Sequence, residues 1–570
     1  MHLFDSASKH AAMGTTFVAH EQSAAMAADG YYRVSGHLGG CIVTSGPGAT
    51  NLLTGVCCSY YDSVPSLMLT GQVATHRLKG DRRVRQVGFQ ETDVLSIYSS
   101  VTKFAYQVLD PSKIAWALDT AYAEAESGRP GPVLLDIPDD LQRAEVDADR
   151  LKRSAVQPRS IPFGLEASAG KVIRRIEAAK RPVIILGGGL NTPRAAAPLR
   201  ELLRALQVPI LQTWAGVDLV PYDWPYRFGT FGVYGPRLGN FIVQNADLVV
   251  CLGTRLSQNL TGALLDKFAS GAHLVMVDAD QGEMDKFDGR GLSVGERLCC
   301  RLDDFLEAAL VAAKTFHRPD ISGWLTTIGR WAQVLPTDIP EVPDDSRGIV
   351  DAFDFVTKLS KHLSNEEIVF VDTGGNLTWT CNNIRVKAEQ RIISAWNFTP
   401  MGYALPAAIG GAAAASGRPI TVIIGDGGLQ LCLGELATVI RYNLPLKIFL
   451  FNNHSHGIQK QTLETWLDGR YVGVDPASGL GFCDFPQVAR AMDFPVITIN
   501  RSSVVEKQLK EVYATSGPVF CNVEINPEQK LYPVLKSGAI LQEQLPRLPE
   551  ATLRALGEQE IRPSRDDDAA

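Results

Sequence analysis

Asp426 and Asn453 are the side chains whose chemical type and position point most directly to a reaction centre. An apolar run over Ile420–Ile424 predicts a strand that ends just before Asp426, and a second run over Leu446–Phe451 ends just before Asn453. If the two strands are parallel neighbours joined by a right-handed crossover, their carboxyl ends lie about 4.8 Å apart. Asp426 and Asn453 are then expected to face each other where open α/β sheets bind ligands.

One carboxylate, one amide oxygen and a nearby main-chain carbonyl would form a hard, all-oxygen site that suits Mg²⁺. Mg²⁺ completes its octahedron with water and phosphate oxygens, so this site predicts a diphosphate ligand. The main-chain N–H groups of Gly427 and Gly428, at the start of a predicted helix, are suited to cradle that diphosphate. Alone, Gly-Asp-Gly is more typical of a simple turn. The asparagine pair at the end of the next strand favours the metal–diphosphate interpretation.

Short apolar strands followed by glycine-rich turns recur along the chain and indicate parallel sheets with crossover helices. Strands are predicted over Cys41–Thr44, Val183–Leu186 and Thr421–Ile424. One helix is predicted after Asp426, with an apolar face that carries Leu429, Leu433, Leu436 and Ile440. Polar, proline-containing segments near Gln157–Phe163 and Leu335–Arg347 interrupt the pattern. We therefore expect three α/β units, each a doubly wound parallel sheet, followed by a helix and a frayed tail.

The chain has 570 residues, a net charge of −7 at pH 7 and no stripe of clustered lysine and arginine. This charge pattern argues against nucleic acid or an anionic membrane as the main partner. The ten cysteines show no Cys-x-x-Cys pair and no zinc-ligand spacing, so they are expected to be reduced and buried. No apolar run reaches the roughly 18 residues of a membrane span, and the first residues do not resemble a signal peptide. A soluble, cytoplasmic enzyme is expected.

The Gly-Asp-Gly turn and the asparagine pair together resemble the signature of thiamine diphosphate-dependent enzymes. From residue 1 to about residue 545, the chain resembles the acetolactate (acetohydroxyacid) synthase family, in its synthase-like branch. Five separate segments carry this likeness, namely His20–Gly30, Thr44–Asn51, Gly71–Val73, Arg129–Val133 and Met401–Ala408.

The resemblance implies the thiamine diphosphate-binding fold, with thiamine diphosphate and Mg²⁺ as cofactors. It implies an N-terminally short pyrimidine-binding domain over 1–155, a central domain over 160–330, a diphosphate- and magnesium-binding domain over 348–545 and a tail over 546–570. A homodimer or homotetramer is also implied, because in the family the cofactor bridges the pyrimidine domain of one chain and the diphosphate domain of another. The chain begins at what resembles the family's first helix, so the family's opening strand is expected to be missing or to lie upstream of a misplaced start.

The resemblance assigns Glu21, Met401 and Gln90 to catalysis. Glu21, expected after a strand over Phe17–Ala19, matches the glutamate that hydrogen-bonds the aminopyrimidine ring and so favours removal of the thiazolium C2 proton. An isolated glutamate there would more often complement a helix N-terminus. Met401 matches the hydrophobic residue that bends the cofactor into a V shape, although an unmatched methionine is usually a packing residue. Gln90, with Phe89, resembles an active-site Phe-Gln pair, and surface or packing roles stay open for both.

The resemblance also assigns two loops to the diphosphate and the metal. The metal ligands implied are Asp426, Asn453 and the main-chain carbonyl of Ser455. Lys103 matches a lysine near the active site, with a packing role equally open. The cofactor-binding residues implied, besides Glu21 and Met401, are Thr373, Gly374, Gly375, Asn376, Gly427, Gly428, Asn453 and Ser455, where Asn376 replaces a histidine common in the synthases.

Three departures from the family bear on the substrate and on a second cofactor. Thr462 stands where the synthases have a tryptophan that selects the acceptor, which predicts a smaller, more polar acceptor pocket. Gly232–Gly235 and Leu252–Arg255 resemble flavin-binding segments, but Ser257–Asn259 replaces their Asp-Asp-Arg, so FAD binding stays open. The pair His454 and His456 could donate protons to an intermediate or bond the diphosphate, and we favour the second role.

These residues predict a thiamine diphosphate- and Mg²⁺-dependent carboligase. It would decarboxylate a 2-oxo acid, pyruvate first of all, and transfer the acyl-anion equivalent to a carbonyl acceptor. The alternatives are a simple 2-oxo acid decarboxylase, a flavin-using oxidase and a catalytically silent scaffold subunit. Whether the acceptor is a 2-oxo acid, an aldehyde or a keto-sugar stays open, and Thr462 favours an acceptor other than that of acetolactate synthase itself.

Overall fold

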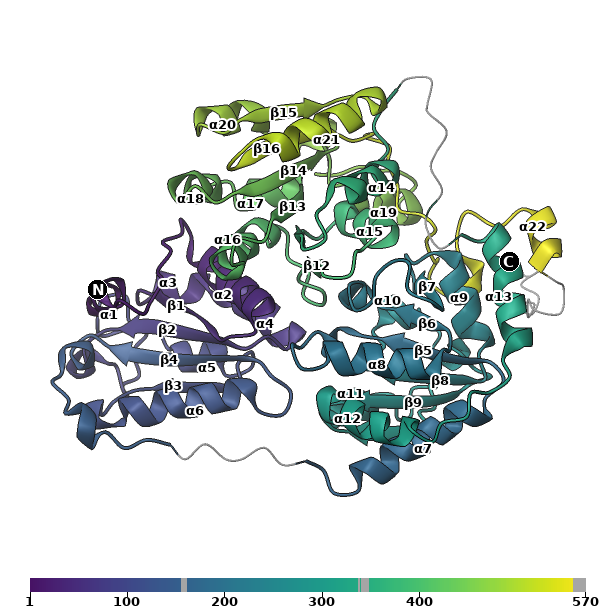
Figure 1. Ribbon diagram of the computed structural model, residues 1–570. Helices are drawn as coiled ribbons and strands as arrows, with labels where there is room; N and C mark the ends of the chain where they lie inside the picture. The colour runs from purple at the N-terminus through teal and green to yellow at the C-terminus, as the bar shows by residue number, and fades with distance from the viewer. Residues whose placement is uncertain (155–160, 337–338, 340–347, 557–570) are drawn as a thin grey trace. The chain divides into compact units, whose positions relative to one another are not determined.

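The computed structural model describes residues 1–154, 161–336, 339 and 348–556, and shows three parallel sheets with helical crossovers (Figure 1). The α/β fold class is thereby confirmed. Most of the interruptions predicted near Gln157–Phe163 and Leu335–Arg347, and the predicted frayed tail after Leu556, lie outside the described residues. Across the part of the chain that the structure describes, no helix is both long enough and apolar enough to cross a membrane.

The N-terminal sheet has four parallel strands in the order β1-β2-β4-β3. Its most buried strand, β4, reads Pro-Val-Leu-Leu-Asp-Ile-Pro, as expected for a strand covered on both faces. The strands are β1 (Gly39–Val43), β2 (Ser66–Gln72), β3 (Phe104–Gln107) and β4 (Pro132–Pro138). The helices are α1 (His2–Lys9), α2 (Glu21–Ser35), α3 (Pro47–Asn51), α4 (Leu53–Asp62), α5 (Val94–Tyr98) and α6 (Ile114–Glu126).

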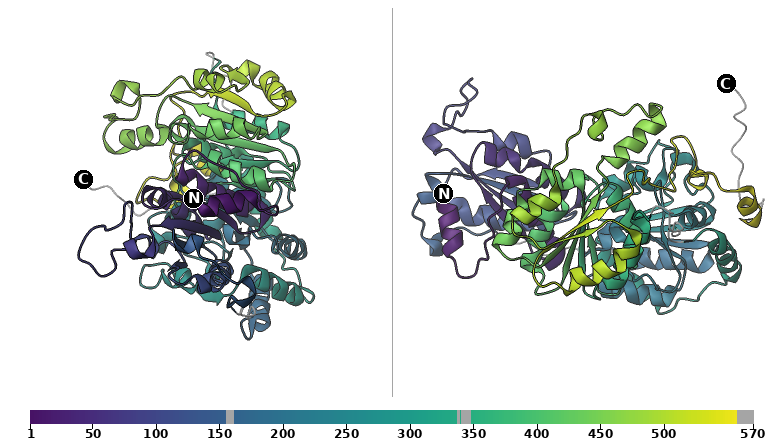
Figure 2. Two further views of the ribbon diagram at one scale, coloured as in Figure 1. Left: turned by 90° about the vertical axis from the view of Figure 1, so that its left-hand side faces the viewer. Right: turned by 90° about the horizontal axis from the view of Figure 1, so that it is seen from above.

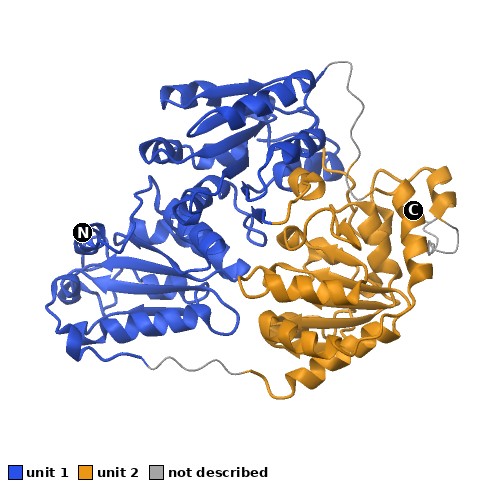
Figure 3. Cartoon of the chain, viewed as in Figure 1, with its two compact units in different colours: residues 1–159, 344–377, 389–529 blue, residues 160–343, 378–388, 530–570 orange. Residues whose placement is uncertain are grey.

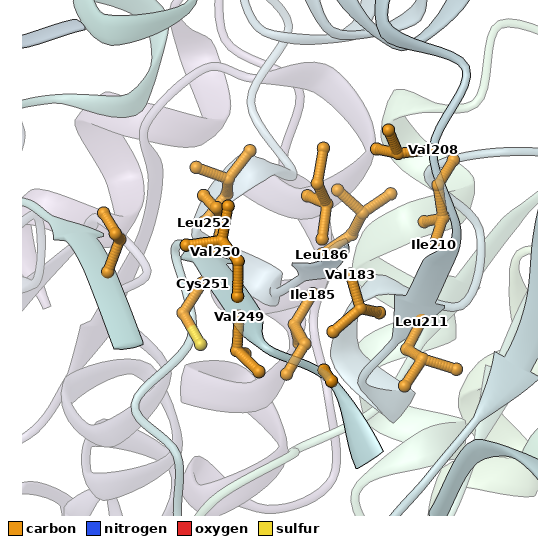
Figure 4. Close-up of a cluster of buried hydrophobic side chains, with 14 of the residues drawn as sticks. Val183, Ile185, Leu186, Val208, Ile210, Leu211, Val249, Val250, Cys251 and Leu252 are labelled. Carbon is orange, nitrogen blue, oxygen red and sulfur yellow. The ribbon is translucent and has the colours of Figure 1, made fainter. Parts of the chain in front are cut away.

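The central sheet has six parallel strands in the order β10-β9-β8-β5-β6-β7. Aliphatic side chains of β5, β6 and β8 form the buried core that Figure 4 shows. The strands are β5 (Pro182–Leu186), β6 (Ile210–Gln212), β7 (Arg227–Thr230), β8 (Leu248–Leu252), β9 (His273–Asp278) and β10 (Glu296–Cys299). The helices are α7 (Leu165–Ala178), α8 (Ala196–Leu206), α9 (Arg237–Asn245), α10 (Gln258–Thr261), α11 (Gln281–Asp285), α12 (Leu302–Ala313) and α13 (Ser322–Val334).

The C-terminal sheet also has six parallel strands, in the order β12-β11-β13-β14-β16-β15. The strands are β11 (Ile368–Val371), β12 (Arg391–Ile393), β13 (Ile420–Gly425), β14 (Leu446–Asn452), β15 (Val496–Ile499) and β16 (Val519–Glu524). The helices of this part and of the last segment are α14 (Ala352–His362), α15 (Gly375–Asn383), α16 (Ala404–Ala414), α17 (Asp426–Leu431), α18 (Glu435–Arg441), α19 (Gly457–Trp466), α20 (Phe485–Ala491), α21 (Val505–Ala514) and α22 (Glu550–Leu556).

The chain divides into two compact units (Figure 3). Unit 1 holds the N-terminal and C-terminal sheets and consists of residues 1–159, 344–377 and 389–529. Unit 2 holds the central sheet and consists of residues 160–343, 378–388 and 530–570. Two sheets far apart in the sequence thus share one unit, whereas the segment after residue 529 belongs with the central sheet.

Within unit 1, α2 and α16 lie against each other and join the N-terminal sheet to the C-terminal sheet (Figures 1 and 2). A Cβ atom at Gly30 would lie 2.0 Å from the main-chain oxygen of Ala407, and one at Gly410 would lie 1.8 Å from that of Ala27. The two backbones therefore approach closely only because both positions are glycine. Beside this contact, the Tyr403 hydroxyl donates a hydrogen bond to the buried carboxylate of Asp29.

Two local predictions were wrong. The single helix expected after Asp426 is divided into α17 and α18, and Glu435, the first residue of α18, accepts hydrogen bonds from the main-chain N–H groups of Ala19 and His20. The strand expected over Phe17–Ala19 is absent from the described structure, because side chains bind its amides in place of a neighbouring strand. Besides Glu435, the Tyr442 hydroxyl accepts a hydrogen bond from the Phe17 N–H at 2.9 Å.

Candidate active site

The loops after β11, β13 and β14 gather at the carboxyl edge of the C-terminal sheet. The strand order reverses between β11 and β13, because β12 lies on one side of β11 and the later strands lie on the other. Open α/β sheets bind ligands at such a switch point. β13 and β14 pair in parallel, with Gly425 opposite Phe451. Asp426 directly follows Gly425, and Asn453 lies two residues after Phe451. Both residues therefore lie at the carboxyl ends of neighbouring strands, as the sequence predicts.

Asp426, Asn453 and Ser455 bring three oxygen atoms together. The side-chain oxygen of Asn453 faces the main-chain oxygen of Ser455 at 2.9 Å and Oδ2 of Asp426 at 3.2 Å. Exchanging the oxygen and nitrogen of the amide would turn both contacts into hydrogen bonds donated by Asn453. The Asp426 carboxylate is buried and also accepts hydrogen bonds from the main-chain N–H groups of Gly427 at 2.6 Å and Ser455 at 3.2 Å.

The three groups together offer the types of oxygen donor that Mg²⁺ prefers: a carboxylate, a side-chain amide and a main-chain carbonyl. Burial raises the pKa of Asp426 to about 6, and a cation at this point would restore the ionised form. No group of three His, Cys, Asp or Glu side chains in the described residues could hold a metal. An amide and a main-chain carbonyl must therefore contribute to any such site.

Asp372, at the end of β11, connects the loop Thr373–Asn376 to the segment that carries Met401. Its carboxylate accepts hydrogen bonds from the main-chain N–H groups of Thr373 at 2.7 Å and Gly402 at 3.0 Å. Burial is the largest influence on this carboxyl and raises its pKa to about 7. In the same loop, the Asn376 amide donates a hydrogen bond to the main-chain oxygen of Asp372 at 2.6 Å. These hydrogen bonds tie the loop after β11 to the end of that strand and to Gly402.

Met401 and His456 lie together over Gly427. A Cβ atom at Gly427 would be 2.6 Å from Nε2 of His456 and 2.7 Å from Cε of Met401. His456 is half-buried, and burial lowers its pKa. His454 takes a different environment, since its Nε2 lies 2.8 Å from a carboxylate oxygen of Glu524, and this hydrogen bond raises its pKa. The two histidines are therefore not equivalent, and only His456 lies beside Met401.

Glu21 and Gln90 lie on the two sides of the glycine-rich turn after β1. Glu21 begins α2 and accepts a hydrogen bond from the Asn51 side chain at 3.0 Å. A Cβ atom at Gly48 would be 3.5 Å from Oε1 of Glu21, and one at Gly46 would be 2.9 Å from Cβ of Gln90. In the described residues, Glu21 makes no hydrogen bond to Asp426 or Asn453. The structure thus forms two separate clusters, one around Glu21 and Gln90 and one around Asp426.

Three further residues that the sequence singled out lie outside both clusters. Phe89 is 84% exposed. The Lys103 ammonium binds the Ser127 hydroxyl and the main-chain oxygens of Glu124 and Ser127, next to the C-terminal end of α6, which is a helix-capping arrangement. Thr462 lies exposed on α19 and donates its hydroxyl hydrogen to the main-chain oxygen of Ile458. The contacts of Lys103 favour the packing role.

The central sheet changes winding direction between β5 and β8, and its glycine-rich turns meet there. A Cβ atom at Gly187 would lie 2.2 Å from the main-chain oxygen of Gly253, so these turns pack backbone against backbone. Among the described residues, buried polar atoms of Thr192, Thr213 and Trp214 have no hydrogen-bond partner. Nε of Arg255 donates to Glu283 at 2.7 Å.

The other flavin-like segment, Gly232–Gly235, is covered by the last segment of the chain. The Gln544 side chain donates hydrogen bonds to the main-chain oxygens of Gly232 at 3.3 Å, Val233 at 3.2 Å and Gly235 at 2.9 Å. The ring of Tyr234 in this segment also stacks on Trp214, with 6.3 Å between ring centroids.

Sequence reasoning did not identify Asp372 and Glu435. Asp372 follows the predicted strand Ile368–Val371, so the rule that identified Asp426, a carboxylate at the end of a parallel strand, could have found it. Glu435 lies inside a predicted helix and binds amides 415 and 416 positions earlier, and no local pattern signals such a contact.

Comparison with known proteins gives a consistent result over most of the chain. Three family models match: the N-terminal TPP binding domain of thiamine pyrophosphate enzymes over residues 1–97, the central domain over 169–297 and the C-terminal TPP binding domain over 372–523. The acetolactate synthase large subunit of Cyanidium caldarium is 30% identical over 531 residues, which cover 91% of this chain and 87% of that protein. The acetolactate synthase isozyme 2 large subunit of Escherichia coli (strain K12) is 31% identical over 530 residues, which cover 93% and 92%. With three matching domains and relatives of this length, the chain belongs to the thiamine pyrophosphate enzymes and, within them, to the acetolactate synthase large-subunit family.

Proposed function

We propose that this protein is a thiamine diphosphate- and Mg²⁺-dependent carboligase that decarboxylates a 2-oxo acid, pyruvate first of all, and transfers the acyl-anion equivalent to a carbonyl acceptor. The observation that carries this proposal is the oxygen cluster of Asp426, Asn453 and Ser455 at the edge of the C-terminal sheet. When bound, thiamine diphosphate supplies an electron sink for the charge released with CO₂. The relatives named acetolactate synthase support the same class of reaction.

The residues around the cluster fit a metal-bound diphosphate. Asp426, Asn453 and the Ser455 carbonyl would hold Mg²⁺, which keeps its other positions for water and phosphate oxygens. The main-chain N–H groups of Gly427 and Gly428, at the start of α17, would face the phosphates. The loop Thr373, Gly374, Gly375 and Asn376, which Asp372 holds in place, would close the diphosphate site from the other side.

Glu21 and Gln90 would act on the organic part of the cofactor and on the substrate. Glu21 would hold a proton between its carboxylate and the aminopyrimidine ring, while Met401 supports the thiazolium ring. Because Glu21 forms its own cluster, separate from Asp426, we propose that each active site pairs Glu21 of one chain with Asp426 of another. The protein would then be a homodimer or homotetramer, and a lone chain would be inactive.

The acceptor site distinguishes this chain from the synthases. Thr462 lies exposed and donates its hydroxyl hydrogen to Ile458 within α19, so it adds a small polar surface where a tryptophan would add a large apolar one. We propose an aldehyde or keto-sugar acceptor rather than a second 2-oxo acid. We further propose the domain limits 1–155, 160–330 and 348–545, a tail over 546–570 and a cytoplasmic location.

FAD is proposed as a second cofactor of the central sheet. The unpartnered polar atoms of Thr192, Thr213 and Trp214 fit a polar ligand at the crossover between β5 and β8. Purified protein should then show flavin absorbance near 450 nm that persists through gel filtration. Colourless protein that gains no absorbance after incubation with FAD would contradict this assignment.

Release of CO₂ from pyruvate tests the main proposal. The purified protein, with thiamine diphosphate and Mg²⁺, is incubated with pyruvate and a panel of aldehydes, 2-oxo acids and keto-sugars, and the products are identified by mass spectrometry. A coupled product confirms a carboligase, whereas aldehyde alone indicates a decarboxylase. Failure to release CO₂ from any 2-oxo acid tested would sink the proposal and favour the scaffold alternative.

Glu21→Gln provides the matched variant for this test. It keeps the size of the side chain but cannot exchange a proton with the aminopyrimidine ring. We expect turnover to fall about 100-fold or more, while the affinity for thiamine diphosphate changes little. Unchanged turnover would show that Glu21 complements only the N-terminus of α2.

A further inference from the structure

We propose that Nε2 of His456 donates a hydrogen bond to the diphosphate of the cofactor and so acts as a cofactor-positioning residue. The inference rests on the proposed function, since it requires thiamine diphosphate at the Asp426 cluster. Three observations support it: the place of His456 beside Gly427, the lack of a hydrogen-bond partner for its ring among the described residues and the contrast with His454.

The place of His456 follows from the contacts over Gly427. Gly427 directly follows the carboxylate that would bind Mg²⁺, and Met401, which would support the thiazolium ring, lies over the same glycine. A cofactor whose ring rests on Met401 and whose phosphates meet the metal at Asp426 must cross the surface of Gly427. Nε2 of His456 is the side-chain nitrogen at this crossing, 2.6 Å from where a Cβ atom of residue 427 would stand.

The ring of His456 is positioned by its neighbours, while its two nitrogens stay available for hydrogen bonds. In the part of the chain that the structure describes, neither ring nitrogen hydrogen-bonds another protein group. The ring lies edge-on to Phe482, with 6.1 Å between ring centroids and an interplanar angle of 78°. The main-chain N–H of His456 donates to the oxygen of Val474 at 2.8 Å, which fixes the start of α19. A positioned ring with an unused donor beside an expected polyanion is suited to a charge-assisted hydrogen bond.

His454 shows the opposite arrangement two residues earlier. Its φ of 53° turns the chain, and its Nε2 lies against the Glu524 carboxylate at 2.8 Å. This ring therefore already has an anionic partner within the protein, and it provides the matched control. Asparagine is the suitable replacement, because it tolerates positive φ.

The test measures binding rather than turnover. Titration calorimetry with Mg²⁺ gives the affinities of the wild-type protein, His456→Ala, His456→Gln and His454→Asn for thiamine diphosphate and for inorganic pyrophosphate. His456→Ala should bind both ligands about tenfold more weakly, since a hydrogen bond to a charged group is lost. His456→Gln places an amide nitrogen near the position of Nε2 and should recover most of the affinity. His454→Asn should stay within about twofold of wild type for both ligands.

Each outcome decides between explanations. Equal affinities for wild type and His456→Ala would overturn the inference, and so would a loss for thiamine diphosphate without a loss for pyrophosphate, because His456 would then face the organic part of the cofactor. If His456→Ala unfolds at lower temperature than wild type, His456→Asn, which is too short to reach the Nε2 position, replaces it. A wild-type protein that binds neither ligand would instead refute the proposed function.

Discussion

The C-terminal and central sheets carry glycine-rich turns at the same place in the same kind of topology, yet these glycines have different physical roles. At the C-terminal sheet, a Cβ atom at Gly427 would first meet the ends of two side chains, Met401 and His456. At the central sheet, a Cβ atom at Gly187 would meet the main chain of Gly253. A glycine-rich turn after a parallel strand therefore does not by itself indicate a ligand. In the first turn the glycine leaves room beside an anionic side chain, and in the second it lets two loops touch.

The largest expected effect comes from removing the anionic group of the C-terminal turn. In Asp426→Ala, the proposed metal site loses its only charged ligand, so Mg²⁺-dependent affinity for thiamine diphosphate should fall about 1,000-fold or more. Titration calorimetry with and without Mg²⁺ measures this loss, and circular dichroism verifies the fold. If Asp426→Ala keeps wild-type affinity, the C-terminal turn is not a metal and cofactor site, and its difference from the central turn is refuted.

A pair of equivalent substitutions tests the two roles of glycine directly. Gly187→Ala forces a methyl group against the main chain of Gly253 and should reduce the free energy of unfolding by about 3 kcal/mol. Gly427→Ala displaces only side chains, so it should weaken cofactor binding with a smaller effect on stability. Thermal unfolding and cofactor titration of both variants provide the measurement. The comparison is wrong if the two variants lose stability and affinity to the same extent.

The pH dependence of stability tests a second loop at the same edge of the C-terminal sheet, the loop after β11 that begins with Asp372. Burial raises the pKa of Asp372 to about 7, above the value of about 3.9 for an exposed aspartate, so the unfolded chain releases this proton first as the pH rises. Protonated Asp372 therefore makes its full contribution to the free energy of unfolding below about pH 4, and this contribution is lost as the pH rises to about 7. Between pH 5 and pH 7, wild type should lose about 2.5 kcal/mol more than Asp372→Asn, which cannot titrate. Parallel pH profiles in urea unfolding would contradict the assignment.

The smallest expected effect concerns the last segment on the central sheet. Gln544→Ala removes the amide that binds the main-chain oxygens of Gly232, Val233 and Gly235, and because Gly232 and Val233 keep other donors, the loss should cost about 1 kcal/mol of stability. Cofactor affinity at the C-terminal sheet should stay unchanged. Calorimetric unfolding with and without thiamine diphosphate separates the two effects, and a loss of cofactor affinity would mean that the two regions are coupled.

The sequence predicted those features that depend on strand ends and failed where distant segments meet. Asp426 and Asn453 were predicted correctly as neighbours, because the carboxyl ends of adjacent parallel strands must lie together. The break between α17 and α18 was missed, because the apolar spacing of Leu429 and Leu436 continues through it. The position of Asp372 at a strand end could have been predicted, but its partners, Gly402 and Ala404, come 30 and 32 residues later and could not. The catalytic roles of Glu21, Met401 and Gln90 stay predictions.

The glycines between α2 and α16 also bear on how this protein could be divided for experiments. Because the two helices approach closely at Gly30 and Gly410, the surfaces they share contain main-chain atoms. Cutting the chain between the N-terminal and C-terminal sheets would expose these surfaces to water, along with the buried Asp29. We therefore expect neither sheet to be recovered as a stable fragment when expressed alone, whereas co-expression of residues 1–159 and 344–529 should allow the two fragments to assemble.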